Sequence, residues 1–235
     1  MTDALWIAAK CGLMIIFGIL AGNGAVYCFN KIPAQWLCDY GEEPSEELRN
    51  PYTQRVKSYP WKYVFTKLFI ILGIKMVMDD VQFAVAGICA LWLLLEMSIA
   101  DVKYRIVPDQ FILLLAVTAL GFIPFHFDWL SCLFGCLTGF GVMGFTALAG
   151  RLISRKDAVG GGDIKLFSAL GLIAGPCGII FIFAATALLS GAHVVYMLVR
   201  RKITVKSHVP MVPYIAIAAG IYIVFFCENI QILNL

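Results

Sequence analysis

The sequence has little charge: only 14 % of its 235 residues are charged, whereas 61 % are hydrophobic. Soluble domains of this length rarely exceed about half apolar residues, so this balance excludes an ordinary soluble protein and predicts a polytopic membrane protein in contact with a lipid bilayer. The net charge of +3 is small, and the sequence has no basic patch interleaved with aromatic residues. We therefore expect no nucleic-acid partner.

Closely spaced cysteine pairs are also missing. The chain has eight cysteines but no CxxC pair, which argues against a structural zinc site. Seven of the eight lie in apolar segments, where cysteine behaves as a small hydrophobic residue, and only Cys38 lies in a polar loop. The sequence thus predicts no metal ligands.

Apolar runs, by contrast, are abundant. A membrane-spanning helix needs roughly 20 apolar residues. The first run lacks a strongly basic leader and a clear cleavage site, which predicts a retained helix rather than a signal peptide. The candidate spans are Cys11–Phe29, 63–78, 81–100, 110–125, 129–150, 164–175, 177–199 and 209–227. We expect an all-α protein of about eight transmembrane helices, divided into a first helix with a polar loop (1–62) and a membrane-embedded domain (63–235).

The distribution of basic residues predicts how the chain is oriented. With the amino terminus outside, the inner loops and helix ends hold 15 of the 18 Lys and Arg residues; Lys10, Lys67 and Lys75 are the exceptions. Cytoplasmic loops carry such an excess of basic residues. The pattern therefore favours eight spans with both termini outside.

One apolar segment is too short for this scheme. The stretch 164–175 would be about 18 Å long as a helix, whereas the hydrocarbon core is roughly 30 Å thick. A single overlong helix broken at Gly175–Pro176 is the alternative, but it would move the basic residues 200–202 outside. The sequence favours a short or tilted helix that turns near Gly175–Pro176.

Two aspartates lie at the predicted inner face. Asp101 ends one apolar segment, and Asp163 begins another after three consecutive glycines. Two carboxylates that come close can share one proton, and such a pair can hydrolyse a peptide bond, one acid activating water and the other donating a proton. A helix start favours an ionised acid and a helix end disfavours it, which predicts Asp163 as the base and Asp101 as the proton carrier.

The neighbouring residues have structural or supporting interpretations. Val107 before Pro108 is pushed out of the helical region, so the chain breaks there and Asp109 is predicted as a helix N-cap. Lys165 either offsets the charge of Asp163 or anchors the helix at the interface. Gly160, Gly161 and Gly162 permit a close approach of a substrate backbone.

Two further polar residues lie inside apolar segments. Glu96 is interpreted as a buried, hydrogen-bonded acid, with a role in the site as the alternative. His193 is interpreted as a core histidine rather than a ligand.

Both aspartate segments resemble motifs of the prepilin peptidase family, which belongs to the GxGD-type intramembrane aspartyl proteases. Residues 101–109 (DVKYRIVPD) match D-x6-P-D, residues 160–165 (GGGDIK) match GxGDxK, and the stretch 208–220 is similar to a proline-rich terminal helix of that family. The resemblance covers roughly residues 85–225. It implies Asp101 and Asp163 as catalytic residues, with Pro108, Asp109, Gly160, Gly161, Gly162 and Lys165 as support.

The resemblance also implies a function: cleavage of the short basic leader of type IV prepilin-like or pseudopilin precursors at the cytoplasmic face of a bacterial inner membrane. The cut would fall after a glycine at the start of an apolar helix. The acidic patch Glu42–Glu47 is either a docking site for a basic leader or a solvated loop.

The chain departs from bacterial members in its inner loop, which lacks two CxxC pairs, and in GNGAVYCFNKIP at the end of the first helix. We expect no cofactor for the peptidase, and S-adenosylmethionine only if an N-methyltransferase activity is retained. The alternatives are a proton-coupled transporter that uses the acids as a relay and a scaffold of a pilus or secretion machine.

Overall fold

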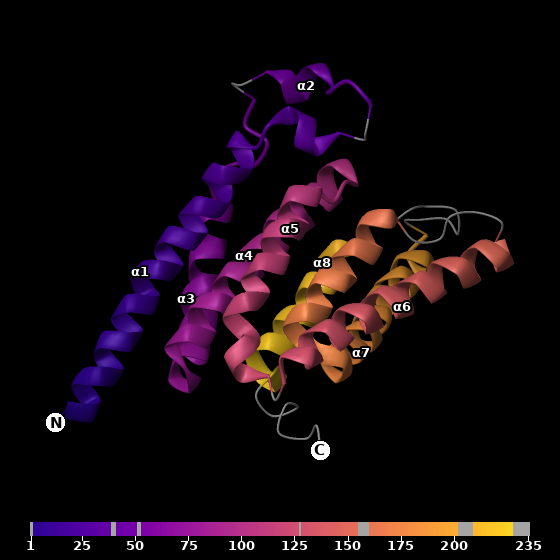
Figure 1. The fold of residues 1–235 in the computed structure, drawn as a ribbon. Coiled ribbons are helices and arrows are strands. Elements are labelled where there is room, and N and C mark those ends of the chain that lie inside the picture. Colours follow the sequence, from indigo (N-terminus) through magenta and orange to yellow (C-terminus); the bar gives the residue numbers. More distant parts are fainter. Residues whose placement is uncertain are drawn as a thin grey trace. The chain divides into compact units, whose positions relative to one another are not determined.

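The protein is helical throughout the part of the chain that the structure describes. This computed structural model describes residues 2–38, 41–50, 53–126, 128–154, 160–201 and 209–227, and none of them forms a strand (Figure 1). The elements are α1 (Thr2–Lys31), η1 (Ala34–Leu37), α2 (Glu46–Arg49), α3 (Trp61–Asp79), α4 (Val81–Tyr104), α5 (Asp109–Thr118), η2 (Ala119–Phe125), α6 (Trp129–Ser154), α7 (Gly161–Val199), α8 (Val212–Ile221) and the π-helical η3 (Tyr222–Phe226). The predicted all-α class is confirmed.

Among the described residues, four helices are long and apolar enough to cross a membrane: α1, α4, α6 and α7. The helical stretches Asp109–Phe125 and Val212–Phe226 are apolar but shorter. The chain is therefore a membrane protein, while the number of eight spans stays a prediction.

The predicted orientation depends partly on Arg155, Lys156, Lys202 and Lys206, which lie outside the described residues. The predicted orientation therefore stays a prediction, and so does the predicted boundary between residues 1–62 and 63–235. The chain forms two compact units, residues 1–96 and 97–235, and α4 contributes to both.

In the first unit, α1 packs closely on α3. A Cβ atom at Gly22 would lie 2.3 Å from the Thr66 Cα, and one at Gly18 would lie 2.9 Å from the Ile70 nitrogen. Only glycine leaves room for this approach of two backbones, as is common between membrane helices. The Trp92 indole of α4 donates a hydrogen bond to the Ala21 carbonyl at 3.1 Å. These contacts fix α1 against α3 and α4.

The second unit is built around α7, which is a hairpin of two helices. Gly175 has φ 69° and ψ 179° and interrupts the helix, and Pro176 follows it. The rings of Phe167 and Phe183 have centroids 6.1 Å apart, whereas a straight helix would place these positions about 24 Å apart. The chain therefore turns back at the corner, and the prediction of a short helix that turns near Gly175–Pro176 is confirmed.

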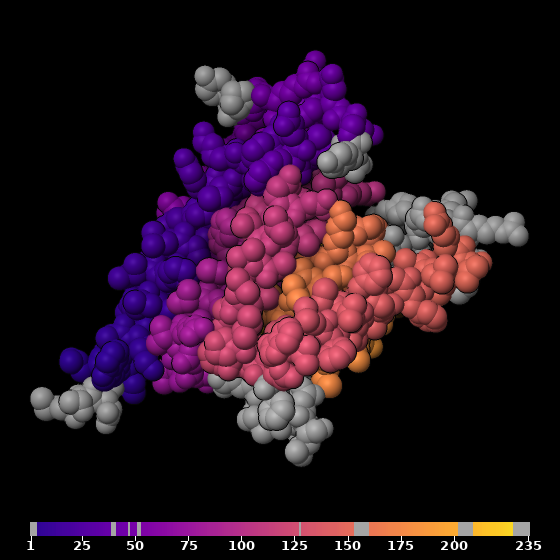
Figure 2. Space-filling model, in the orientation of Figure 1, coloured from indigo at the N-terminus to yellow at the C-terminus, as the bar shows by residue number. Residues whose placement is uncertain are grey.

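Small residues bring α6 and the first half of α7 into backbone contact. A Cβ atom at Gly135 would lie 2.1 Å from the Gly171 oxygen, and one at Gly139 would lie 2.3 Å from the Phe167 oxygen. Figure 2 shows α6 covering much of α7, with part of the first half of α7 visible between α5 and α6. This packing holds the short helix that begins with the glycine run.

The corner at Gly175–Pro176 is closed by side chains from two other elements. A proline has no N–H, and a kink leaves carbonyl groups without their helical donors. The His126 Nε2 lies 3.0 Å from the Ile173 oxygen, and the Tyr222 hydroxyl donates to the Ala174 oxygen at 3.0 Å. Both carbonyls are thereby satisfied, so the kink is stabilised by η3 and by the segment before α6.

Candidate active site

Asp101 lies in the last turn of α4 and is buried, with 7 % of its surface exposed. Arg105 follows the last helical residue with φ 57° and donates its backbone N–H to the Asp101 carbonyl. The Asp101 carboxylate accepts a hydrogen bond from the Val212 backbone N–H at 2.8 Å. The start of α8 therefore faces Asp101, and a helix start carries partial positive charge.

Asp163 lies in the first turn of α7, as the glycine run predicts. Gly160 is the N-cap residue, and the Asp163 N–H donates to its carbonyl at 3.1 Å. The carboxylate folds back toward the cap, since a Cβ atom at Gly160 would lie 3.5 Å from the Asp163 Oδ2. The acid is partly buried at the positive end of its helix, a position that favours a carboxylate.

Two contacts connect the chain that follows Asp101 with the residues on either side of Asp163. A Cβ atom at Gly162 would lie 3.0 Å from the Val107 Cβ, so a glycine here lets α7 approach the linker between α4 and α5. The Lys165 Nζ binds both oxygens of Asp109, at 2.9 and 2.8 Å. Motif pieces that are about 60 residues apart in sequence thus lie side by side.

The two acids are near enough to interact electrostatically: the charge on Asp101 acts on Asp163. The positive charge of Arg105 acts on Asp101. Within the described residues, no group of three or more His, Cys, Asp and Glu side chains could hold a metal ion. Two interacting carboxylates can provide a proton acceptor and a proton donor.

Comparisons with known proteins identify the family of this chain. The family model described as the type IV leader peptidase family matches residues 88–195, a range that includes both aspartates. "Leader peptidase HopD" of Escherichia coli is 32 % identical over 123 residues, which cover 51 % of this chain and 79 % of that protein. This chain belongs to the type IV leader peptidase family.

Longer relatives in the leader peptidase family match less completely. "Prepilin leader peptidase/N-methyltransferase" of Pseudomonas aeruginosa is 32 % identical over 135 residues, or 55 % of this chain and 46 % of that protein. The protein of the same name from Aeromonas salmonicida is 24 % identical over 169 residues, or 69 % of this chain and 56 % of that protein. The chain spans about half the length of these relatives. No solved structure gives a significant match.

The residues around the aspartates of this leader peptidase family member lie partly where the sequence predicts. The helix break before Pro108 is confirmed, because α4 ends at Tyr104 and α5 begins at Asp109. The prediction of Asp109 as the N-cap is wrong: Pro108 occupies that position, and Asp109 is the first helical residue, free to bind Lys165. Neither interpretation of Lys165 foresaw this ion pair.

The two other polar residues in apolar segments differ from expectation. Glu96 is fully buried, but neither carboxylate oxygen has a hydrogen-bond partner within the described part of the chain. It is therefore a buried acid without the expected hydrogen bond. His193 is exposed, so the interpretation as a core histidine is wrong, and its ring contacts Tyr214 at a centroid distance of 5.6 Å.

Sequence reasoning missed Val212, His126 and Tyr222. Val212 acts through its backbone N–H and is 111 positions from Asp101, so its side chain carries no signal. The proline-rich stretch around it did indicate a helix start. His126 and Tyr222 bind carbonyls that the corner at Gly175–Pro176 exposes, and a search for donors to satisfy that predicted corner could have found them.

Proposed function

We propose that this family member is an aspartyl endopeptidase that cleaves the leader of type IV prepilin-like precursors, with Asp101 and Asp163 as the catalytic pair. One observation carries the proposal: the last turn of α4 and the first turn of α7 each present an acid, and the contacts of Gly162 and Lys165 hold the two segments together. Two carboxylates that share a proton can hydrolyse a peptide without a cofactor.

The hydrogen bond from Val212 supports a specific division of roles. A hydrogen bond to the charged form of a carboxylate favours that form, and on the bond from Val212 we assign Asp101 as the anion of the pair, although Asp163 also lies at a helix start. In this proposal, Asp101 accepts a proton from water, and the resulting hydroxide attacks the scissile carbonyl carbon. Asp163 donates its proton to the carbonyl oxygen. This order reverses the roles expected from the sequence, which considered the helix start at Asp163 and the helix end at Asp101 but not the N–H of Val212.

Collapse of the tetrahedral intermediate completes the proposed reaction. The carbonyl re-forms, the peptide C–N bond breaks, and Asp101 returns the proton to the leaving amine while Asp163 regains its own. The two acids thereby end the cycle in the protonation states in which they began it. Because they interact electrostatically, the pair titrates as one coupled system.

The site would face the cytoplasm of a bacterial inner membrane, in keeping with the clustering of basic residues in the predicted inner loops. There, a basic leader would lie in water while the residues after the cut enter the bilayer. Asp101 and Asp163 both lie at helix ends rather than in helix centres, which suits access from the membrane edge.

Hydrolysis by the purified protein is the decisive test. The wild type should cleave a prepilin-like precursor with a basic leader, and Asp101→Asn and Asp163→Asn should each lose at least a thousandfold in kcat. Both variants must be shown to melt like the wild type in detergent. Cleavage at near wild-type rates by either folded variant would exclude the catalytic pair.

Methylation of the new amino terminus is a second proposal, supported by the names of the two longer relatives. S-adenosylmethionine would be the methyl donor. Mass spectrometry of the product with and without this compound tests it: a gain of one methyl group only with the donor supports the activity, and an unmodified amino terminus in both samples excludes it.

A proton-coupled carrier remains the alternative, and Glu96 is the observation in its favour. A buried acid without a hydrogen-bond partner is costly unless it is protonated or functional. Proteoliposomes should show proton flux that Glu96→Gln abolishes if the carrier exists. If proteoliposomes keep their proton gradient and the protein cleaves a precursor, the carrier is excluded and the peptidase is supported.

A further inference from the structure

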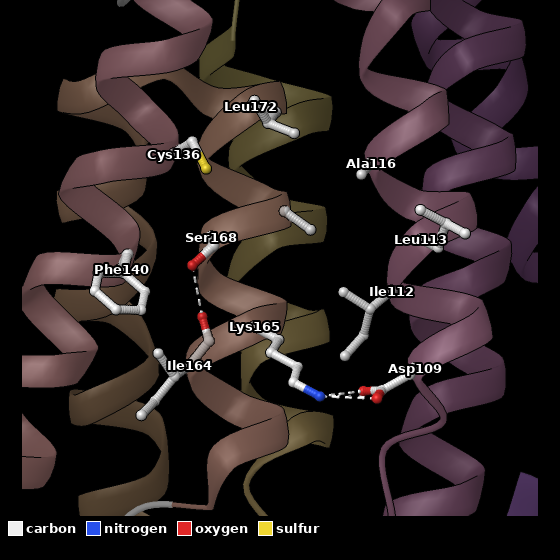
Figure 3. A pocket seen from close by; sticks show the side chains of 11 residues that line it. Asp109, Ile112, Leu113, Ala116, Cys136, Phe140, Ile164, Lys165, Ser168 and Leu172 are labelled. Carbon is white, nitrogen blue, oxygen red and sulfur yellow. Dashed lines mark hydrogen bonds and ion pairs between the residues drawn. The ribbon is translucent and has the colours of Figure 1, made fainter.

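Thr186 lies in the second half of α7 and is fully buried, yet its hydroxyl oxygen has no hydrogen-bond partner within the described part of the chain. Hydroxyls elsewhere in the second unit are bonded: Thr138, Thr146 and Ser168 each donate to the carbonyl four positions earlier, as Figure 3 shows for Ser168. A buried polar group without a partner is costly, so such groups are rare and call for an explanation. The Thr186 hydroxyl is therefore available to a bound molecule.

The hairpin of α7 brings Thr186 level with Asp163. The rings of Phe167 and Phe183 meet across the hairpin, with their centroids 6.1 Å apart. Asp163 lies one turn before Phe167 on the same helix face, and Thr186 lies one turn after Phe183. Because the two halves of α7 run in opposite directions, both turns lead toward the same end of the hairpin. Asp163 and Thr186 therefore lie beyond the same aromatic contact, at the same level of the two halves.

The same face of the second half leads on to the residues that hold Asp101. His193 follows Thr186 by seven positions, or two turns, and its ring contacts Tyr214 at a centroid distance of 5.6 Å. Tyr214 lies in the first turn of α8, where the Val212 N–H binds the Asp101 carboxylate. The face from Thr186 to His193 thus extends from the level of Asp163 to the start of α8.

A buried hydroxyl level with Asp163 suits one step of the proposed reaction. In that step the scissile carbonyl oxygen gains negative charge as hydroxide attacks, and Asp163 supplies its proton. A hydroxyl can donate a hydrogen bond to such an oxygen, and a donor fixed in a buried site stabilises the charge more than a donor in water does. The attacking water belongs to Asp101, so the position of Thr186 favours the carbonyl oxygen as its partner.

We propose that the Thr186 hydroxyl donates a hydrogen bond to the scissile carbonyl oxygen and is a third catalytic residue beside Asp101 and Asp163. The inference depends on the proposed peptidase function and adds a residue to its site. The competing explanation is a packing role, in which Thr186 only fills the core. Valine has nearly the shape of threonine but lacks the hydroxyl, so an experiment can separate the two roles.

Two substitutions at Thr186 should affect activity and stability in opposite ways. Thr186→Val removes the hydroxyl, so kcat for a precursor should fall about tenfold or more with KM within about twofold of wild type, while the melting temperature in detergent stays the same or rises. Thr186→Ser keeps the hydroxyl but loses a methyl group, so kcat should stay within about threefold while the melting temperature falls. A packing role predicts the reverse order of activities.

Thr146→Val is the matched control. Thr146 is also partly buried in a helix of the second unit, but its hydroxyl donates to the Val142 carbonyl of its own helix. Thr146→Val should keep kcat within about twofold of wild type. Wild-type kcat in Thr186→Val, or an equal loss of kcat in Thr146→Val and Thr186→Val, would overturn the inference.

A precursor with a thioamide at the scissile bond tests which atom the hydroxyl contacts. Sulfur is a weak hydrogen-bond acceptor, so the hydroxyl should contribute little to cleavage of this precursor. The ratio of wild-type kcat to Thr186→Val kcat should therefore approach one. A ratio as large as that for the ordinary precursor would mean that the hydroxyl serves another group, and the assignment to the carbonyl oxygen would be wrong.

Failure of the proposed function would look different from failure of this inference. A folded wild-type protein that cleaves no precursor would overturn the peptidase proposal, and the role of Thr186 with it. Cleavage that requires both Asp101 and Asp163 but proceeds equally well in Thr186→Val would overturn the role of Thr186 alone.

Discussion

The close approach of α6 and α7 predicts opposite effects for two alanine substitutions on the same helix. At Gly139, a Cβ atom would lie 2.3 Å from the backbone oxygen of Phe167, whereas ordinary contact begins near 3.4 Å. The added methyl group meets backbone, so α6 must move away from α7 by about 1 Å. At Gly141, a Cβ atom would have nothing within 4 Å.

The expected magnitudes follow from these distances. Overpacking of a well-packed contact costs about 1–3 kcal/mol, so Gly139→Ala should destabilise the protein by that amount. Gly141→Ala should stabilise it by about 0.5–1 kcal/mol, because alanine is the better residue inside a helix. The difference of roughly 1.5–4 kcal/mol corresponds to a melting temperature gap of at least about 3 °C for a chain of this size.

Thermal unfolding of both purified variants in the same detergent measures this gap. Because the same packing positions α7, whose first turn carries Asp163, Gly139→Ala should also reduce precursor cleavage more than Gly141→Ala does. Equal melting temperatures for the two variants, or a more stable Gly139→Ala, would refute the reasoning about backbone contact between α6 and α7.

Three further predictions concern single contacts. Val212→Pro removes the N–H that binds Asp101, and a hydrogen bond to a charged group is worth about 1.5–3 kcal/mol. The kcat for precursor cleavage should therefore fall about ten- to hundredfold. Val212→Ala, which keeps the N–H, should reduce kcat less. The ion pair of Lys165 and Asp109 is more than half exposed (58 % and 56 %), so Asp109→Asn should change the free energy of unfolding, measured with denaturant, by less than about 1 kcal/mol. Burial lowers the pKa of His126, and its contact with the Ile173 carbonyl only partly offsets this. As the pH falls through about 6.5, His126 therefore binds a proton in the unfolded chain more readily than in the folded protein. The melting temperature should fall from about pH 7.5 to about pH 5.5. The fall should be smaller in His126→Gln.

The sequence was sufficient to predict what depends on local chemistry. Apolar runs predict the helices, Gly175–Pro176 predicts the corner in α7, and Asp101 and Asp163 lie at the helix ends that their flanking residues indicate. Helix propensity, proline geometry and the burial of apolar residues act over a few positions, so they can be inferred without a structure.

The contacts between distant segments could not be predicted in the same way. The pairing of Lys165 with Asp109 depends on where α5 lies against α7, and the hydrogen bond from Val212 depends on a backbone group that every residue except proline possesses. The glycines of α6 did carry a signal, since small residues four positions apart, as at Gly135 and Gly139, are typical of close helix contacts. Their partners on α7 emerge only from the fold.

The contacts of the carboxyl-terminal helical segment have a consequence for biosynthesis. Val212 supplies the N–H that binds Asp101, and Tyr222 closes the corner behind Asp163 at the Ala174 carbonyl. A ribosome makes both aspartates before it makes either of these residues. In the nascent protein the proposed site therefore stays unfinished until α8 and η3 have emerged and inserted, so the proposed activity would appear only after that step.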